Sequence, residues 1–142
     1  MKNTYQTPTE IEAVVSGFES CGTGKDDFKH REHLTVAVSY LSCSTPKQAA
    51  DKMRIGLLRF LAHHGVGSEK YNETLTMFWV AMVRQTLGEI GPDSSLVEKC
   101  NRVIEVLGNP ALAFDYYSKE LLWSDEARKA CVEPDLKDWE KV

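Results

Sequence analysis

Helix start and stop signals occur along most of this chain, and they constrain its fold more than any other feature of the sequence. Residues 7–10 (Thr-Pro-Thr-Glu) and 45–48 (Thr-Pro-Lys-Gln) both match the capping-box pattern, with proline at the first helical position. Glycine or proline follows most of the segments that such signals open. These signals predict main helices over about 8–21, 30–43, 46–64, 72–88 and 95–107, and shorter ones over 111–117 and 124–131.

No segment shows the sustained alternation of apolar and polar residues that is typical of a half-buried strand. The chain has 142 residues, which is close to the common size of one domain, and no linker or internal repeat divides it. We therefore predict an all-α fold, a single-domain bundle over 1–142 with about five main helices plus short C-terminal helices.

The charge pattern excludes several partners from the prediction. The formal net charge is −4, and the basic residues form no block. A nucleic-acid interface needs a basic footprint to neutralise phosphates, and an anionic membrane surface attracts basic segments in the same way.

The N-terminus resembles no signal peptide, and the four cysteines contain no C-x-x-C pair. We therefore expect no nucleic acid, no membrane, reduced thiols and a cytoplasmic location.

The four histidines fall at informative positions on the predicted helices. On a helical wheel, His30 and His33 share the apolar stripe of the second helix, at a spacing that lets two side chains meet. His64 falls in the apolar stripe of the third helix, in its last turn, whereas His63 falls at the margin. Three of the four histidines are therefore expected to point inward.

Short connections then bring these residues to one end of the bundle. Helices 30–43 and 46–64 should be antiparallel neighbours, so His64 returns to the side where His30 and His33 begin. The next connection is also short, and it places Glu73 at the same end. Imidazole and carboxylate together suit zinc, iron, nickel or manganese. The predicted site is thus a divalent metal ion bound by His30, His33, His64 and Glu73, with Tyr71, Thr74 and Thr76 as further candidates to line a pocket.

Each of these residues also has a structural explanation. An inward histidine is more often a hydrogen-bonded core residue than a ligand, and His64 at a helix C-terminus interacts favourably with the helix dipole when protonated. Glu73 in a first turn complements the dipole in the same way, and Asn72 is an ordinary N-cap. Trp79 and Trp123 are expected to be core aromatic residues.

Three segments carry a resemblance to a known family: 28–34 (FKHREHL), 62–66 (AHHGV) and 71–76 (YNETLT). They resemble a family of small helical proteins with F-x-H-x-x-H-L, then H-G-V, then Y-H-E-T-x-T, and parts of 117–136 are similar as well. The resemblance implies that His30, His33, His64 and Glu73 occupy inward polar positions. It departs at Asn72, where the family pattern has histidine. The family brings no established reaction.

Two functions follow from these expectations. The first is a metal-dependent enzyme that acts on a small molecule, in which the metal activates water or dioxygen and Glu73 serves as ligand or general base. The second is a non-catalytic helical module that binds a small ligand or a partner, with structural histidines. A ferritin-like di-iron bundle fits poorly, because the chain lacks the paired Glu-x-x-His motifs of that architecture.

Overall fold

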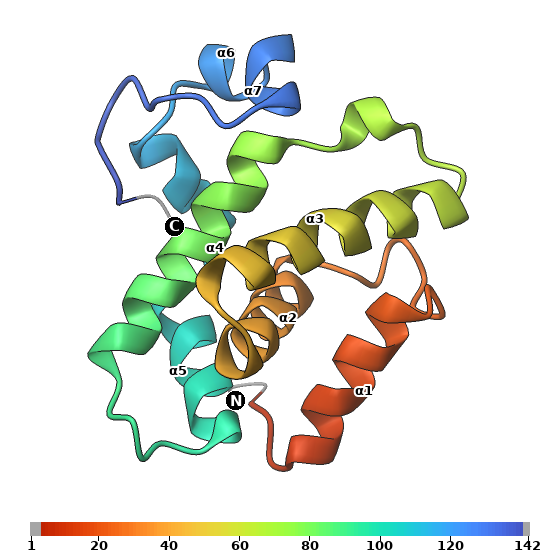
Figure 1. The fold of residues 1–142 in the computed structure, drawn as a ribbon, viewed down its shortest axis with the longest axis vertical. Helices are drawn as coiled ribbons and strands as arrows, with labels where there is room; N and C mark the ends of the chain where they lie inside the picture. Colours follow the sequence, from red (N-terminus) through yellow and green to blue (C-terminus); the bar gives the residue numbers. More distant parts are fainter. Residues whose placement is uncertain (1–3, 141–142) are drawn as a thin grey trace.

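The structure of this protein is a computed structural model, and it describes residues 4–140. All regular secondary structure in that range is helical (Figure 1), which confirms the all-α prediction. None of these helices is both long and apolar enough to span a lipid bilayer. The longer helices are α1 (Pro8–Glu19), α2 (His30–Cys43), α3 (Pro46–His63), α4 (Glu73–Glu89) and α5 (Leu96–Leu107), and the short ones are η1 (Ser68–Lys70), η2 (Pro110–Asp115), α6 (Lys119–Leu122) and α7 (Asp125–Lys129).

The predicted capping boxes form at the starts of α1 and α3. The Thr7 hydroxyl accepts a hydrogen bond from the backbone N–H of Glu10, and the Glu10 carboxylate accepts one from the backbone N–H of Thr7. Thr45 and Gln48 make the same reciprocal pair at α3. Each box satisfies backbone donors that the first helical turn leaves open, so it fixes where the helix begins.

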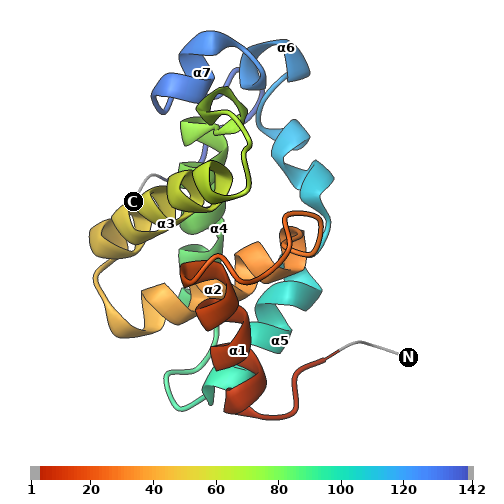
Figure 2. The same ribbon diagram turned by 90° about the vertical axis from the view of Figure 1, so that its right-hand side faces the viewer.

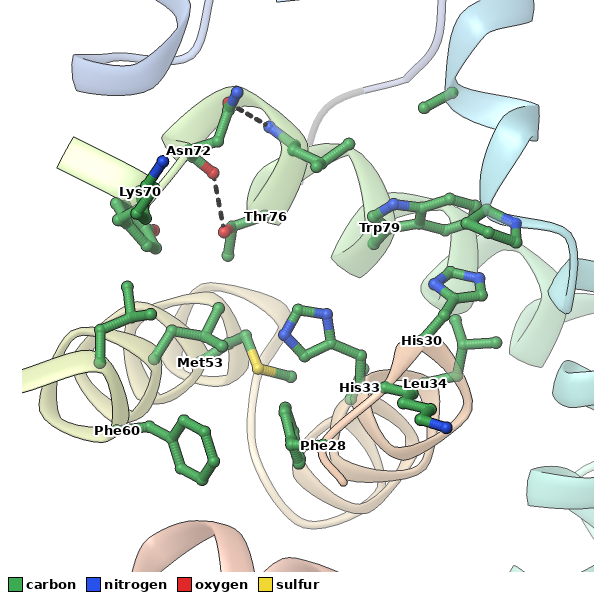
Figure 3. A pocket seen from close by; sticks show the side chains of 18 of the residues that line it. Phe28, His30, His33, Leu34, Met53, Phe60, Lys70, Asn72, Thr76 and Trp79 are labelled. Carbon is green, nitrogen blue, oxygen red and sulfur yellow. Dashed lines mark hydrogen bonds between the residues drawn. The ribbon is translucent and has the colours of Figure 1, made fainter. Parts of the chain in front are cut away.

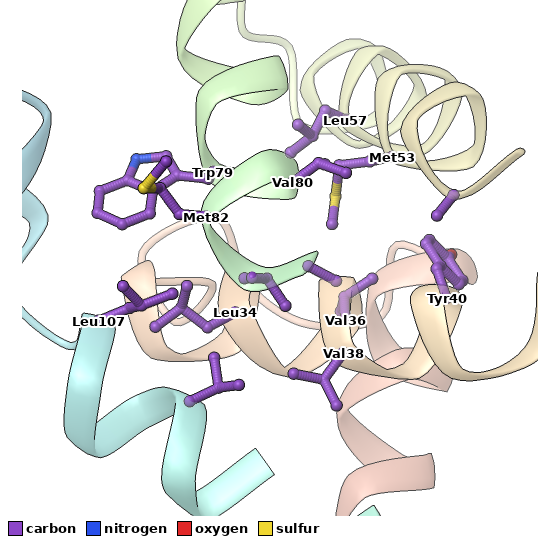
Figure 4. Packing of buried hydrophobic residues seen from close by; sticks show 14 of the residues in the cluster. Leu34, Val36, Val38, Tyr40, Met53, Leu57, Trp79, Val80, Met82 and Leu107 are labelled. Carbon is purple, nitrogen blue, oxygen red and sulfur yellow. The ribbon is translucent and has the colours of Figure 1, made fainter. Parts of the chain in front are cut away.

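Helix α2 forms the centre of the molecule, where it contacts α1, α3, α4 and α5. Its side chains Leu34, Val36 and Val38 are buried against these neighbours (Figure 4). Helix α4 is the second buried element, since Phe78 and Val83 are fully enclosed. Two apolar helices packed together in this way supply most of the core, which is the expected place for helices that are apolar nearly all round.

Helix α3 folds back over α2 after the short turn at Ser44 and Thr45 (Figure 2). The end of α3 therefore lies on the side of the molecule where α2 begins. The C-terminal segment, with η2, α6 and α7, lies beside the first turns of α4 (Figure 1). This arrangement brings four parts of the chain around one space.

Helix boundaries differ from the prediction by more than one residue at three places. Helix α1 ends at Glu19 rather than near Cys21, because Cys21 adopts a left-handed backbone conformation with φ of 63° that ends the helix. The helix expected over 111–117 is a 3-10 helix over Pro110–Asp115, and the one expected over 124–131 covers only Asp125–Lys129. Helix α6, capped by the Ser118 hydroxyl, was not anticipated by the sequence pattern.

Candidate functional site

A cavity of about 890 Å³ lies between α2, α3, α4 and the C-terminal segment. Most of its wall is apolar, with side chains such as Met53, Leu57, Phe60, Trp79 and Val80. A volume of several hundred Å³ with a mainly apolar lining and a few polar groups is typical of a small-molecule site. The polar groups therefore decide what such a cavity can bind.

His33 is the polar side chain that projects furthest toward the middle of this cavity from α2. Figure 3 shows its ring pointing from α2 toward Thr76 of α4, above Phe28. The rings of Phe28 and His33 meet edge-on, with centroids 5.0 Å apart. No hydrogen bond joins the His33 ring to any described residue. Burial, together with the neighbouring His30, lowers the pKa of His33 to about 4, so the ring is neutral at physiological pH.

His30 lines the same cavity but already has a partner. Its Nε2 lies 2.8 Å from the carbonyl oxygen of Leu107, to which it donates a hydrogen bond. Its ring also packs edge-on against Trp79, with centroids 4.4 Å apart (Figure 3). Burial lowers the pKa of His30, although the hydrogen bond to Leu107 acts in the opposite direction. Because Nε2 carries the proton, only Nδ1 of this neutral ring can accept a hydrogen bond.

His64 is the C-cap residue of α3, and it lines the cavity beside Phe60. The centroids of these two rings are 4.4 Å apart. Its Nε2 is buried without any hydrogen-bond partner. His63, by contrast, is exposed and does not line the cavity, so the structure orients the two adjacent histidines as the helical wheel predicted.

Glu73 does not line the cavity, and the structure does not bring it to the three histidines. Its carboxylate accepts hydrogen bonds from Arg54 Nε at 3.0 Å, from Arg54 Nη2 at 2.6 Å and from the Tyr71 hydroxyl at 2.6 Å. Arg54 also donates to Asp51 from its Nη1. Burial raises the pKa of Glu73, but the hydrogen bonds from Arg54 and Tyr71 outweigh it and hold the pKa below its usual value. Glu73 is therefore a charged, fully engaged member of an ion pair between α3 and α4.

Asn72 and Thr74 connect the start of α4 to the C-terminal segment. The Asn72 side chain accepts from the backbone N–H of Leu75 and donates to the carbonyl of Leu122 at 2.8 Å. Thr74 donates to the carbonyl of Ala130, so it is used for packing and does not line the cavity. Thr76 does line it, and its hydroxyl donates to the Asn72 carbonyl, which leaves the hydroxyl oxygen able to accept. Asn72 thus joins the start of α4 to the end of α6, and it also lines the cavity.

The metal prediction has mixed support in this geometry. Three of the four predicted ligands, His30, His33 and His64, line one cavity. Within residues 4–140, however, no group of three or more His, Cys, Asp or Glu side chains is placed so that it could hold a metal ion. His30 is hydrogen-bonded to the carbonyl oxygen of Leu107, and the Glu73 carboxylate is hydrogen-bonded to Arg54. Any metal site would therefore require these side chains to leave their present partners.

Sequence reasoning missed several residues of the cavity wall. Trp123, expected in the core, is 44% exposed and lines the cavity, because it follows α6, a helix that the pattern did not predict. Lys25, Lys29 and Lys70 also line it. In the sequence, the only sign of this was that Lys25 and Lys29 come shortly before α2, the helix that carries His30 and His33.

Comparisons with protein-family models, with curated proteins and with solved structures found no match to this chain. The resemblance drawn from the three sequence segments therefore stays a prediction. The function must be argued from the cavity itself.

Proposed function

We propose that this protein binds a small, largely apolar molecule in the cavity between α2, α3 and α4, with His33 as its hydrogen-bond partner. The observation that carries the proposal is the pair His33 and His64 in the wall of a mainly apolar cavity of about 890 Å³. The His33 ring faces this cavity without a hydrogen bond to a described residue, and Nε2 of His64 is buried and unpaired. Buried polar groups in folded proteins are normally paired, and those that are not call for an explanation. A bound molecule with a hydroxyl, carbonyl or amide group would supply the missing partner.

The protonation state of His33 defines the contact further. A neutral imidazole carries one N–H donor and one acceptor nitrogen, so it can serve a ligand group of either kind. Thr76 faces His33 across the cavity and adds an acceptor oxygen (Figure 3). The aromatic rings of Phe28, Phe60 and Trp79 enclose the rest of the space. These features favour a ligand with an apolar body and one polar group near its middle.

The proposal is tested with N-phenyl-1-naphthylamine, a neutral dye whose fluorescence rises in apolar sites and whose N–H can donate to an imidazole. We expect saturable binding with one dye per chain. His33→Leu keeps the apolar wall but removes the hydrogen bond, and it should weaken binding roughly fivefold to tenfold, as expected for one hydrogen bond.

A matched pair of variants locates the binding. Leu75 is half-buried and lines the cavity, so Leu75→Trp should fill part of the space and reduce dye binding strongly. Leu58 lies on the outer face of α3 and does not line the cavity, so Leu58→Trp is the control. Equal binding by both variants would contradict the proposed site.

A divalent metal ion is the second candidate, because three imidazoles line one cavity and both His33 and His64 have ring nitrogens without a partner. Elemental analysis of protein purified without chelators tests it. The metal candidate requires a stoichiometric amount of zinc, iron, nickel or manganese that His33→Leu and His64→Ala each reduce. It also requires a metal-dependent rise in melting temperature, since binding to the folded state alone stabilises that state.

A further inference from the structure

We infer that the ligand of this cavity is an organic acid, with its apolar body inside and an anionic group at the rim. The exposed lysines that line the cavity, Lys25, Lys29 and Lys70, supply the positive charge there. This inference rests on the proposed ligand-binding function and adds the chemical class of the ligand.

The charges that line the cavity differ in sign from those of the whole chain. The chain carries a formal net charge of −4. The cavity is lined by three lysines and one aspartate, Asp26, and by no other acidic or permanently charged residue within the described range. An excess of positive charge at one opening of an acidic protein attracts anions to that opening.

The lysines lie at the rim, and within residues 4–140 they form no ion pair that would compete with a ligand. Lys25, Lys29 and Lys70 are all exposed although they line the cavity, which places them where it meets solvent. None of the three forms an ion pair with a residue in 4–140. They come from two segments that both line the cavity, the loop before α2 and the η1 helix before α4.

Asp26 is thus the one carboxylate set against three lysines in the described lining, because Glu73, just outside the cavity, is already paired. Glu73 lies outside the cavity, and Arg54 holds its charge in a hydrogen-bonded ion pair. Tyr71 donates its hydroxyl proton to the same carboxylate. The wall that Tyr71 contributes therefore presents a ring to the ligand rather than a negative charge.

The interior cannot hold the anionic group itself. The pKa of His33 is about 4 and that of His30 is also lowered, so neither ring supplies positive charge near pH 7. A carboxylate placed between Phe28, Phe60 and Trp79 would lose its hydration without gaining a cation, which is costly. The charge of the ligand is therefore best placed at the lysines, while a neutral polar group meets His33.

A free acid fits this site better than a lipid embedded in a membrane. Binding to an anionic bilayer requires a basic surface, and the chain is acidic with no basic block. The three lysines are confined to the rim of one cavity, which suits one charged group on one molecule.

The test compares three ligands with the same body, 4-phenylbutanoate, 4-phenylbutan-1-ol and 4-phenylbutylammonium, by displacement of the dye at low ionic strength. We expect the acid to bind roughly five to ten times more tightly than the alcohol, and the amine to bind most weakly, because each exposed ion pair contributes modestly. Added salt should remove most of this preference. If the alcohol binds as tightly as the acid, the inference is overturned while the ligand-binding function stands. If none of the three binds, the ligand-binding function fails as well.

The lysines are tested by the triple variant Lys25→Gln/Lys29→Gln/Lys70→Gln, in which the acid should lose its advantage over the alcohol. A control triple variant, Lys47→Gln/Lys52→Gln/Lys99→Gln, changes the net charge equally at positions that do not line the cavity, and it should keep the preference for the acid. Loss of the preference in both variants would overturn the assignment to the rim.

Phosphatidylglycerol vesicles decide between the two sources of such an anion. We expect them to leave 4-phenylbutanoate bound. Displacement of the acid by these vesicles would overturn the assignment to a free acid in favour of a membrane lipid.

Discussion

Residues that the sequence predicted to form one site lie in two polar clusters, and these clusters behave in opposite ways in the structure. The closed cluster is Arg54, Glu73 and Tyr71, in which every carboxylate oxygen of Glu73 has a donor within 3.0 Å. The open cluster is His33 and His64, which line the cavity, with no hydrogen bond from the His33 ring to a described residue and with His64 Nε2 buried and unpaired.

The difference separates stabilising polar groups from groups available to a ligand. A buried polar network whose members are all paired holds its helices in place, and here it joins α3 to α4. A buried polar atom without a partner costs folding free energy, and such costs tend to occur at functional sites. The comparison therefore assigns a structural role to the closed cluster and a binding role to the open cluster.

The largest effect that we expect concerns pH and the open cluster. The pKa of His33 is about 4 in the folded protein against an ordinary value of 6.5. Between these values the unfolded chain binds a proton that the folded chain excludes, so stability is complete above about pH 6.5 and is lost as pH falls toward 4. His33→Leu should remove this loss, which is at most about 3 kcal/mol.

Urea unfolding of wild type and His33→Leu at pH 7 and pH 4 measures this effect. Taking the difference between the two proteins cancels the carboxylates that they share. If both lose the same stability, His33 is not held neutral by the cavity, and the open cluster loses its distinguishing property.

Much of this comparison could not be predicted from the sequence. Periodicity and short connections correctly brought His30, His33 and His64 to one cavity, since wheel position and chain reversal are local properties. The same reasoning placed Glu73 with the histidines, but it could not detect that Arg54, 19 residues earlier, would pair with it. Side-chain pairing between helices depends on their relative rotation, which a helical wheel does not contain. The C-terminal wall was missed because α6 and η2 are too short to show a period.

The second expected effect concerns the closed cluster. Glu73→Gln keeps the shape of the side chain but removes the charge that pairs with Arg54. It should reduce the free energy of unfolding by about 1–2 kcal/mol. The effect is modest because the Arg54 side chain is partly exposed to solvent. Dye binding should change little. Denaturant unfolding and dye titration measure the two properties.

The control is the exposed ion pair of Arg102 and Glu105, where Glu105→Gln should cost less than about 0.5 kcal/mol. If Glu73→Gln lost dye affinity without losing stability, Glu73 would have a role in binding rather than the structural role assigned to the closed cluster.

The smallest expected effect distinguishes the adjacent histidines. His64 packs on Phe60, whereas His63 is exposed. His64→Ala should therefore lower the free energy of unfolding by about 1 kcal/mol more than His63→Ala, and it should also weaken dye binding. The two variants serve as controls for each other. Equal effects, or the reverse order, would show that the end of α3 is oriented differently.

The most direct test of the central claim is nuclear magnetic resonance of the side-chain nitrogens in ¹⁵N-labelled protein during titration with 4-phenylbutan-1-ol. The His33→Leu and Arg54→Lys variants assign the two sets of signals. If the open cluster binds the ligand, the imidazole resonances of His33 should shift with saturation while the Nε resonance of Arg54 stays in place. Saturable binding that leaves the His33 nitrogens unchanged and shifts Arg54 would contradict the division of the two clusters and the proposed binding role of the cavity.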